Sequence, residues 1–456
     1  MSCAESAVAT SVADSRLPKL SLAWFGLAVL VAVTVLAAVD RQILALLAEP
    51  LKHSLGLSDT QIGVVNGLAL SLVYGLATVP MGWLADRMER RLLLAISILV
   101  WSAGVAACGL AGGYGALLVA SMVIAVGESV LGSVSYAFIP DLFPVERWVQ
   151  ANAIFFVATL LGTSAGLILS GSTIGLISAH HSALAGPLAR LEPWRVTLLV
   201  AALAGPVLAV LTLSIRTRKA PVSVRSSGTG SSFFAHIREH LRTFIGVCTG
   251  FGFVAAAFGT LLAWLPVVLV RIFGQSPAVT GQQLGLATAA GTLLGTGAAM
   301  FCARRLRAQL GITASLRIAR YAAMLGCVCV PLLLLAKDTW SMYATLVFQL
   351  AFTVCALSLS PTLLQLLAPR AIRARVIAIG GLFALVLQSL SPVVVGLMSD
   401  TLSSRADALL LAVVIVAAPC YLAGAALLSV AEPTLARTCA IAASEAEQEK
   451  RNDTDR

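Results

Sequence analysis

Twelve long, continuous apolar runs are the feature of this sequence that most restricts its fold. Each is long enough to cross a bilayer as an α-helix, which needs roughly 20 apolar residues. The runs do not alternate between apolar and polar residues, which excludes a transmembrane β-barrel. The sequence therefore predicts an all-α membrane protein with transmembrane helices at about 22–47, 61–84, 92–111, 115–138, 149–172, 194–215, 243–270, 280–303, 313–336, 340–366, 374–399 and 407–430.

The composition agrees with a chain whose main solvent is lipid. Of its 456 residues, 59% are hydrophobic and only 11% are charged, and the mean hydropathy is +0.93. Soluble proteins carry about 25% charged residues, so this chain has too few charges to cover a water-facing surface. We therefore attribute the net charge of +10 to loops beside a membrane and not to a nucleic-acid-binding surface.

The distribution of Lys and Arg predicts the orientation. If the N-terminus is cytoplasmic, 24 of the 31 basic residues lie on the cytoplasmic side, six lie on the opposite side, and Arg41 lies within the first span. Basic residues favour the cytoplasmic side of a membrane. We expect both termini in the cytoplasm. No cleavable signal peptide is expected before the first span, and the short loops favour a bacterial inner (plasma) membrane.

A basic, Ser- and Gly-rich stretch divides the twelve runs into two sets of six. We expect two six-helix halves of a transporter, because many transporters are built from such repeats. The predicted organisation is a cytoplasmic tail at 1–21, a first half at 22–215, a cytoplasmic linker at 216–242, a second half at 243–430 and a cytoplasmic tail at 431–456. We expect the protein to be a monomer.

One loop motif resembles the signature of a known family. The turn between the second and third runs reads Gly-x-Leu-Ala-Asp-Arg-x-x-Arg-Arg and resembles the signature loop of the major facilitator superfamily. Gly82 is expected to permit close helix approach, and Asp86 to accept hydrogen bonds at a helix end. The residues of this conformational motif are Gly82, Asp86, Arg87, Arg90 and Arg91.

Charged residues inside the spans are the candidates for chemistry. Asp40 and Arg41 lie in the first run, and Glu128 lies in the fourth. A charge in the membrane costs several kcal/mol unless it has a partner, so intramembrane charges usually carry function. We predict that Arg41 pairs with Glu128. Because burial raises the pKa of a carboxyl and a nearby arginine lowers it, forming and breaking this pair would make Glu128 or Asp40 a proton switch. A static ion pair that fixes helix register is the alternative.

The same residues resemble the Spinster branch of the superfamily. That branch has an Asp-Arg pair in span 1, a Gly-Glu in span 4 and a D-L-F-P-like turn followed by Arg. The matching residues are Asp40, Arg41, Gly127, Glu128, Asp141, Leu142, Phe143, Pro144 and Arg147. The resemblance implies proton-coupled transport of amphipathic lipids such as lysophospholipids or sphingosine phosphate. Relatives often carry an arginine seven residues before the glutamate, where this chain has Ser121.

Further polar and aromatic residues in the spans are candidates for a central cavity, although each is more often used for helix–helix contact. They are Asn66, Tyr74, Ser133, Tyr136, Asn152, Trp264, Gln349 and Gln388. The spacing of the nine cysteines predicts no metal site. No phosphate-binding GxxxxGK[ST] motif occurs, and we expect no cofactor and no catalytic residue.

Two other functions are compatible with these residues. A carrier of small organic anions would use Arg41 to bind a carboxylate. A lipid scramblase would move lipids independently of any gradient. A membrane-embedded enzyme should show paired His or Asp clusters at one membrane face, and we find none in the sequence.

Overall fold

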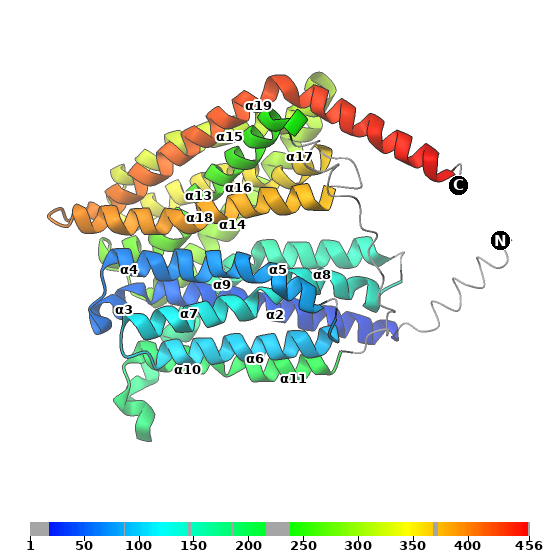
Figure 1. Cartoon of the computed structure of the whole chain (residues 1–456). Coiled ribbons are helices and arrows are strands. Elements are labelled where there is room, and N and C mark those ends of the chain that lie inside the picture. Colours follow the sequence, from blue (N-terminus) through cyan, green and yellow to red (C-terminus); the bar gives the residue numbers. More distant parts are fainter. Residues whose placement is uncertain are drawn as a thin grey trace. The chain divides into compact units, whose positions relative to one another are not determined.

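A computed structural model of the chain describes residues 18–85, 87–144, 147–183, 186–215, 238–367 and 373–454. The described residues are almost entirely helical, and the long helices run side by side within each part of the chain (Figure 1). The helices of the first half of the sequence are α2 (Leu20–Leu46), α3 (Ala48–Leu55), α4 (Asp59–Val64), the π-helix η1 (Val65–Leu72), α5 (Val73–Ala85), α6 (Arg90–Gly109), α7 (Tyr114–Glu128), α8 (Val130–Leu142), α9 (Trp148–His180), α10 (Pro193–Ala202) and α11 (Ala204–Leu213).

The helices of the second half are fewer and longer. They are α13 (Leu241–Arg271), α14 (Pro277–Leu310), α15 (Ala314–Leu332), α16 (Thr339–Ser358), α17 (Ser360–Leu366), α18 (Arg373–Thr401) and α19 (Ala408–Thr454). Short 3-10 turns lie at His181–Ala183, Gly186–Arg190, Gly311–Thr313 and Leu333–Leu335. The helix α19 continues past the predicted end of the last span at residue 430.

The described helices confirm the predicted class of multi-pass α-helical membrane protein. Eleven of them are long and apolar enough to cross a bilayer, and α7 is a shorter apolar helix. Together, α7 and α8 cover the predicted span at 115–138, separated only by Ser129. The predicted span at 61–84 corresponds to three consecutive segments, α4, η1 and α5, because a π-helical stretch interrupts the α-helix.

Contacts group the chain into two compact units. Unit 1 comprises Met1–Gly56, Val73–Arg225 and Pro277–Gly285, and unit 2 comprises Leu57–Leu72, Ser226–Ser276 and Leu286–Arg456. The segment Leu57–Leu72, which contains the first part of the predicted span at 61–84, therefore packs within unit 2, although the remainder of that span belongs to unit 1. The predicted functional halves, 22–215 and 243–430, stay a prediction.

Glycines bring the helices of unit 1 into close contact. A Cβ at Gly127 of α7 would lie 2.7 Å from the backbone nitrogen of Trp101 in α6. A Cβ at Gly104 of α6 would in turn lie 2.9 Å from the backbone nitrogen of Ile124 in α7. Small residues allow membrane helices to approach closely and gain van der Waals contact. The reciprocal glycines therefore lock α6 against α7, the helix that carries Glu128.

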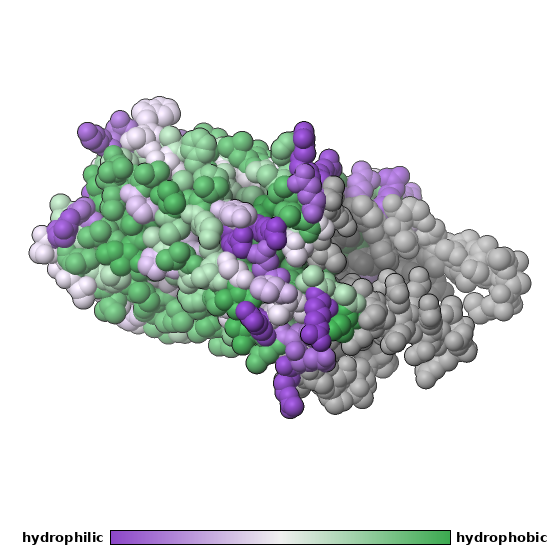
Figure 2. Space-filling model, turned by 90° about the horizontal axis from the view of Figure 1, so that it is seen from above, coloured by the Kyte–Doolittle hydropathy of each residue, from purple (hydrophilic) through white to green (hydrophobic). Residues whose placement is uncertain are grey.

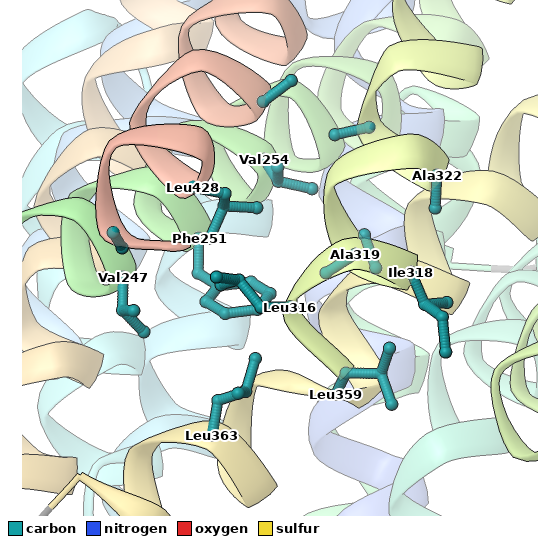
Figure 3. Packing of buried hydrophobic residues seen from close by; sticks show 14 of the residues in the cluster. Val247, Phe251, Val254, Leu316, Ile318, Ala319, Ala322, Leu359, Leu363 and Leu428 are labelled. Carbon is teal, nitrogen blue, oxygen red and sulfur yellow. The ribbon is translucent and has the colours of Figure 1, made fainter. Parts of the chain in front are cut away.

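A layer of aliphatic and aromatic side chains forms the core of unit 2. Figure 3 shows Phe251 of α13 packed among side chains from α15, α17 and α19, including Leu316, Leu363 and Leu428. Phe251 is 3% exposed and the three leucines are at most 1% exposed. This dry core holds the long helices of the second half together.

The outside of the molecule is apolar where lipid would contact it. Figure 2 shows one face on which apolar side chains predominate and hydrophilic residues gather in a few patches. Leu203, just before α11, and Val207 and Val210 within it follow helical spacing and are 61–68% exposed. A contiguous exposed apolar surface of this kind is expected for a protein in a bilayer and not for a soluble monomer.

The α6–α7 contact gives a stability prediction. We expect Gly127→Ala to lower the melting temperature of the detergent-solubilised protein, because the added methyl group meets backbone atoms and overpacking costs about 1–3 kcal/mol. Gly115→Ala on the same helix is the matched control, since no described atom lies within 4 Å of its Cβ position. Both melting temperatures can be measured by scanning fluorimetry that does not use a thiol-reactive dye. Equal melting temperatures for the two variants would contradict this account of the packing.

Candidate coupling site

An ion pair lies between the first and fourth predicted spans. Arg41 Nε of α2 donates to Glu128 Oε2 of α7 at 2.5 Å. The Glu128 side chain is 1% exposed, whereas the Arg41 side chain is 44% exposed. The arginine therefore reaches from an accessible position to a buried carboxylate. The structure thus brings together the two residues whose pairing the sequence predicts.

An aromatic ring completes the surroundings of Arg41. Its guanidinium carbon lies 4.7 Å from the centroid of the Tyr74 ring, at the start of α5. A cation over an aromatic face is stabilised by the ring quadrupole, by about 0.5–2 kcal/mol. Tyr74 is half-buried. Of the predicted cavity residues whose side chains the structure describes, Tyr74 is the one placed beside the ion pair.

Asp40 lies in a different environment from its neighbour Arg41. Adjacent residues on an α-helix point about 100° apart, and Asp40 is 2% exposed. The indole of the fully buried Trp101 lies close to its carboxyl. Among the described residues, Asp40 Oδ1 and Glu128 Oε1 have no hydrogen-bond partner. Two buried carboxyls thus keep one oxygen each for a proton or a water molecule.

Trp101 is a neighbour of the site that sequence reasoning missed. Nothing in the run 92–111 distinguishes this tryptophan from one that faces lipid. The one sequence signal for this contact is indirect. Gly127 precedes Glu128, and a glycine at that position allows another helix to lie against α7. The close contact between Gly127 and the Trp101 backbone is what brings the indole towards Asp40.

Ser121 lies where the resemblance to the Spinster branch implies an arginine. Ser121 is fully buried, and its hydroxyl donates to the Leu117 carbonyl at 2.8 Å. Its Oγ also lies 3.8 Å from Cys108 Sγ. The position is therefore part of the α6–α7 packing and holds no charge, which leaves Arg41 as the basic partner of Glu128 among the described residues.

The arginines of the loop motif make separate contacts. Arg87 lies over the Trp83 ring, with 3.5 Å between its guanidinium carbon and the ring centroid. Arg90 Nη1 donates to Asp141 Oδ2 of α8 at 2.5 Å. Arg91 pairs with Glu89 and donates to the Ile215 carbonyl at 3.0 Å. Arg90 and Arg91 therefore connect the start of α6 with α8 and with the residues that follow α11, and Arg87 covers Trp83 at the end of α5.

Two expectations for this motif have different outcomes. Asp86 lies outside the described residues. No described atom lies within 4 Å of the Cβ position of Gly82, which is half-buried. Among the described residues no helix approaches Gly82 closely, and a role for this glycine in helix approach stays a prediction.

Four of the remaining cavity candidates belong to unit 2, and the side chains of the other three lie outside the described residues. Asn66 is half-buried in η1, and Gln388 is half-buried in α18. Trp264 is 1% exposed, and its indole donates to the Pro392 carbonyl at 3.1 Å, which ties α13 to α18. Gln349 is fully buried, and its backbone carbonyl accepts from Thr353 Oγ1. Three candidates have side chains outside the described residues, namely Ser133, Tyr136 and Asn152.

Sequence comparisons place these features in a known context. A family model described as the Major Facilitator Superfamily matches residues 30–392. An MFS-type efflux pump of Mycolicibacterium smegmatis is 28% identical over 441 residues, covering 93% of this chain and 96% of the relative. Over shorter stretches, the chain matches a probable galactarate/D-glucarate transporter of Bacillus subtilis at 26% identity and spinster homolog 1 of Xenopus tropicalis at 25%.

The two shorter matches have limited coverage. They span 57% of this chain and 60% of the Bacillus protein, and 52% of this chain and 44% of the Xenopus protein. The fold comparison covers more. A crystal structure of a bacterial homolog of the human lysosomal transporter Spinster, inward-facing and unoccupied, aligns with a TM-score of 0.70 at 20% identity, over 92% of this chain and 97% of that one.

The long apolar helices, the loop motif and the match over residues 30–392 lead to one conclusion: the chain belongs to the major facilitator superfamily. It is a multi-pass membrane transporter with the major facilitator fold, and not an enzyme. The resemblance to Spinster proteins is confirmed at the level of fold and of modest sequence identity.

A double-mutant cycle tests whether the ion pair supports the fold. Arg41→Met should lower the melting temperature, because it leaves the buried Glu128 carboxylate without its partner at a cost of roughly 3 kcal/mol. Adding Glu128→Gln should restore most of the loss. If the double variant were as unstable as Arg41→Met, the loss of stability would not come from the broken contact between Arg41 and Glu128.

Proposed function

We propose that the chain is a proton-coupled secondary transporter of amphipathic lipids, of the lysophospholipid or sphingosine-phosphate kind, that works by alternating access. The observation that carries the proposal is the contact between Arg41 and the buried Glu128 inside the membrane spans. Intramembrane ionisable residues of this kind mark proton and substrate pathways in transporters.

The proposed coupling depends on the charge of Glu128. An ionised Glu128 holds Arg41 by charge and by a hydrogen bond, whereas a protonated Glu128 loses the charge attraction. Proton binding would then free the guanidinium, which can form paired hydrogen bonds to a phosphate or carboxylate. Asp40, with an unpaired oxygen in the same region, is the second proposed proton site. Proton and anionic headgroup would compete for the same arginine.

The lipid part of the proposal rests on resemblance and on the character of the spans. The first-half motifs resemble those of the Spinster branch, part of the chain is 25% identical to a Xenopus spinster homolog, and the Mycolicibacterium relative is named an efflux pump. The apolar tail of a lipid substrate could lie among these spans, because few of their side chains are charged. Arg41, whose side chain is 44% exposed, would then receive the anionic headgroup.

The proposed setting is a bacterial inner membrane with both termini in the cytoplasm. The 24-to-6 distribution of basic residues supports this orientation through the positive-inside rule. We propose that the protein acts as a monomer, because each chain would contain a complete set of two halves.

An organic-anion carrier is the second candidate. The exposed guanidinium of Arg41 favours it, as does the similarity to the probable galactarate/D-glucarate transporter. Competition separates the two functions: a lysophospholipid panel should displace the substrate of a lipid carrier, and small aromatic and sugar acids should displace that of an anion carrier. Lipid movement that ignores every imposed gradient would instead indicate a scramblase.

Transport into proteoliposomes tests the coupling. With an imposed pH gradient and a labelled lysophospholipid panel, the wild-type protein should show gradient-driven flux, and Glu128→Gln should lose it by about ten-fold or more. Asp40→Asn should weaken it as well. The matched control is Asp407→Asn, because Asp407 precedes α19 and pairs with Arg405 at 2.9 Å.

The control variant should keep wild-type flux and pH dependence. Wild-type gradient dependence in Glu128→Gln would remove Glu128 from the coupling mechanism. Flux that depends on Glu128 for small acids but not for lipids would retain the proton mechanism and replace the substrate class.

A further inference from the structure

The carboxylate of Asp59 attaches the start of the second predicted span to unit 2. Arg271, at the end of α13, donates from Nη1 to Asp59 Oδ2 at 2.7 Å and from Nη2 to Asp59 Oδ1 at 2.8 Å. Ser399 of α18 donates to Asp59 Oδ2 at 2.6 Å. The Asp59 side chain is 4% exposed and that of Arg271 is 24% exposed. This is a two-point, largely buried arginine–carboxylate pair, the strongest geometry available to such groups.

A second carboxylate binds the same helix from the opposite direction. Asp400, at the end of α18, accepts from the backbone nitrogen of Asp59 at 3.0 Å and from that of Thr60 at 2.8 Å. It also accepts from Thr60 Oγ1 at 2.6 Å. A negative charge at a helix N-terminus satisfies free N–H groups and complements the helix dipole. The start of α4 is thus held both through its own carboxylate and through its backbone.

Beneath these polar contacts the helices meet through glycines. A Cβ at Gly63 would lie 2.5 Å from the Pro392 carbonyl oxygen, and one at Gly67 would lie 2.3 Å from the Ser389 carbonyl oxygen. From α18, a Cβ at Gly396 would lie 2.4 Å from the Asp59 carbonyl oxygen. Close backbone contact of this kind gains van der Waals packing. The glycines therefore add to the polar contacts that hold α4 and η1 against α18.

The second predicted span changes unit where its helix type changes. Segment Leu57–Leu72 belongs to unit 2, and the segment that begins at Val73 belongs to unit 1. The π-helix η1 occupies Val65–Leu72, so it ends at this boundary. π-helical segments are rare and occur frequently at functional sites. The boundary is therefore a natural point for span 2 to bend.

We propose that Asp59, Arg271, Ser399 and Asp400 form a releasable latch that holds the outer part of span 2 in one conformation of the transport cycle, with η1 as the hinge. The proposal rests on the proposed alternating access and on the predicted orientation, in which Asp59 lies on the outer side. It depends on neither the substrate nor the proton. Opening requires both the Asp59–Arg271 pair and the Asp400 cap to break, which biases the equilibrium towards the latched form.

Alkylation of a buried reporter tests the latch without any substrate. Ile62 of α4 is 3% exposed, so Ile62→Cys in a variant lacking the nine native cysteines should react slowly with a membrane-impermeant maleimide. Asp59→Asn and Arg271→Gln should each raise the alkylation rate about ten-fold or more. The exchanged pair Asp59→Arg with Arg271→Asp should return the rate towards its starting value.

The matched control is Glu192→Gln. Glu192 lies on the same predicted side within unit 1, where Arg195 pairs with it at 3.4 Å and Ser54 Oγ donates to it. It should leave the Ile62→Cys rate unchanged. Size-exclusion profiles and melting temperatures establish that each variant is folded. Unchanged alkylation in folded Asp59→Asn and Arg271→Gln would overturn the latch.

The result of the alkylation experiment can be distinguished from the result of the proteoliposome flux experiment. Faster alkylation together with Glu128-independent flux would support the latch and refute the proposed proton site. Unchanged alkylation together with Glu128-dependent flux would do the reverse. A disulfide between Thr60→Cys and Asp400→Cys adds a second arm: it should stop flux of every substrate, and reductant should restore it. Unaltered flux across the closed disulfide would contradict a latch that must open.

Discussion

The cost of an arginine inside a membrane is the constraint from which the rest of this structure follows. Arg41 must remain charged, so it needs an acid within reach, and Glu128 supplies it at 2.5 Å. That contact requires α2 and α7 to lie close together, and the reciprocal glycines Gly104 and Gly127 fix α7 against α6. The fold of unit 1 and the charge pair therefore depend on each other.

The two proposed functional elements use the same physical device in different settings. In each, an arginine contacts a carboxylate that is at most 4% exposed, while the arginine itself remains partly accessible. A pair of this kind is stable while intact, yet one member can exchange its partner for water, a proton or an anion. Glycine-rich packing accompanies both pairs, at Gly127 and at Gly63 and Gly67. Close helix contact thus fixes the positions of both charge pairs.

The spans could be predicted from the sequence because each apolar run is continuous and long enough to cross a bilayer. Helices of soluble proteins do not need such runs. The sequence also predicted the Arg41–Glu128 contact, since isolated membrane charges have few possible partners. It could not reveal the pair of Asp59 and Arg271, because the two residues are 212 positions apart and each lies at a span end, where charged residues are ordinary. The π-helix at Val65–Leu72 likewise leaves no sign in an apolar run.

Residues whose role depends on three-dimensional neighbours were the least predictable. Trp101 and Trp264 both lie in apolar runs, yet one lies beside Asp40 and the other donates to the Pro392 carbonyl. Gly82 matched a family motif but contacts nothing closely. Residue type and spacing identify which side chains need a partner, whereas the partner itself is set by helix rotation, which periodicity alone does not fix.

The central claim is that Glu128 itself gains and loses a proton. Infrared difference spectroscopy of the reconstituted protein across a range of pH reports protonated carboxyl groups directly and needs no substrate. The account predicts a titrating carboxyl band in the wild-type protein that disappears in Glu128→Gln. A band of the same position and amplitude in Glu128→Gln would show that the proton is carried elsewhere and would contradict the account.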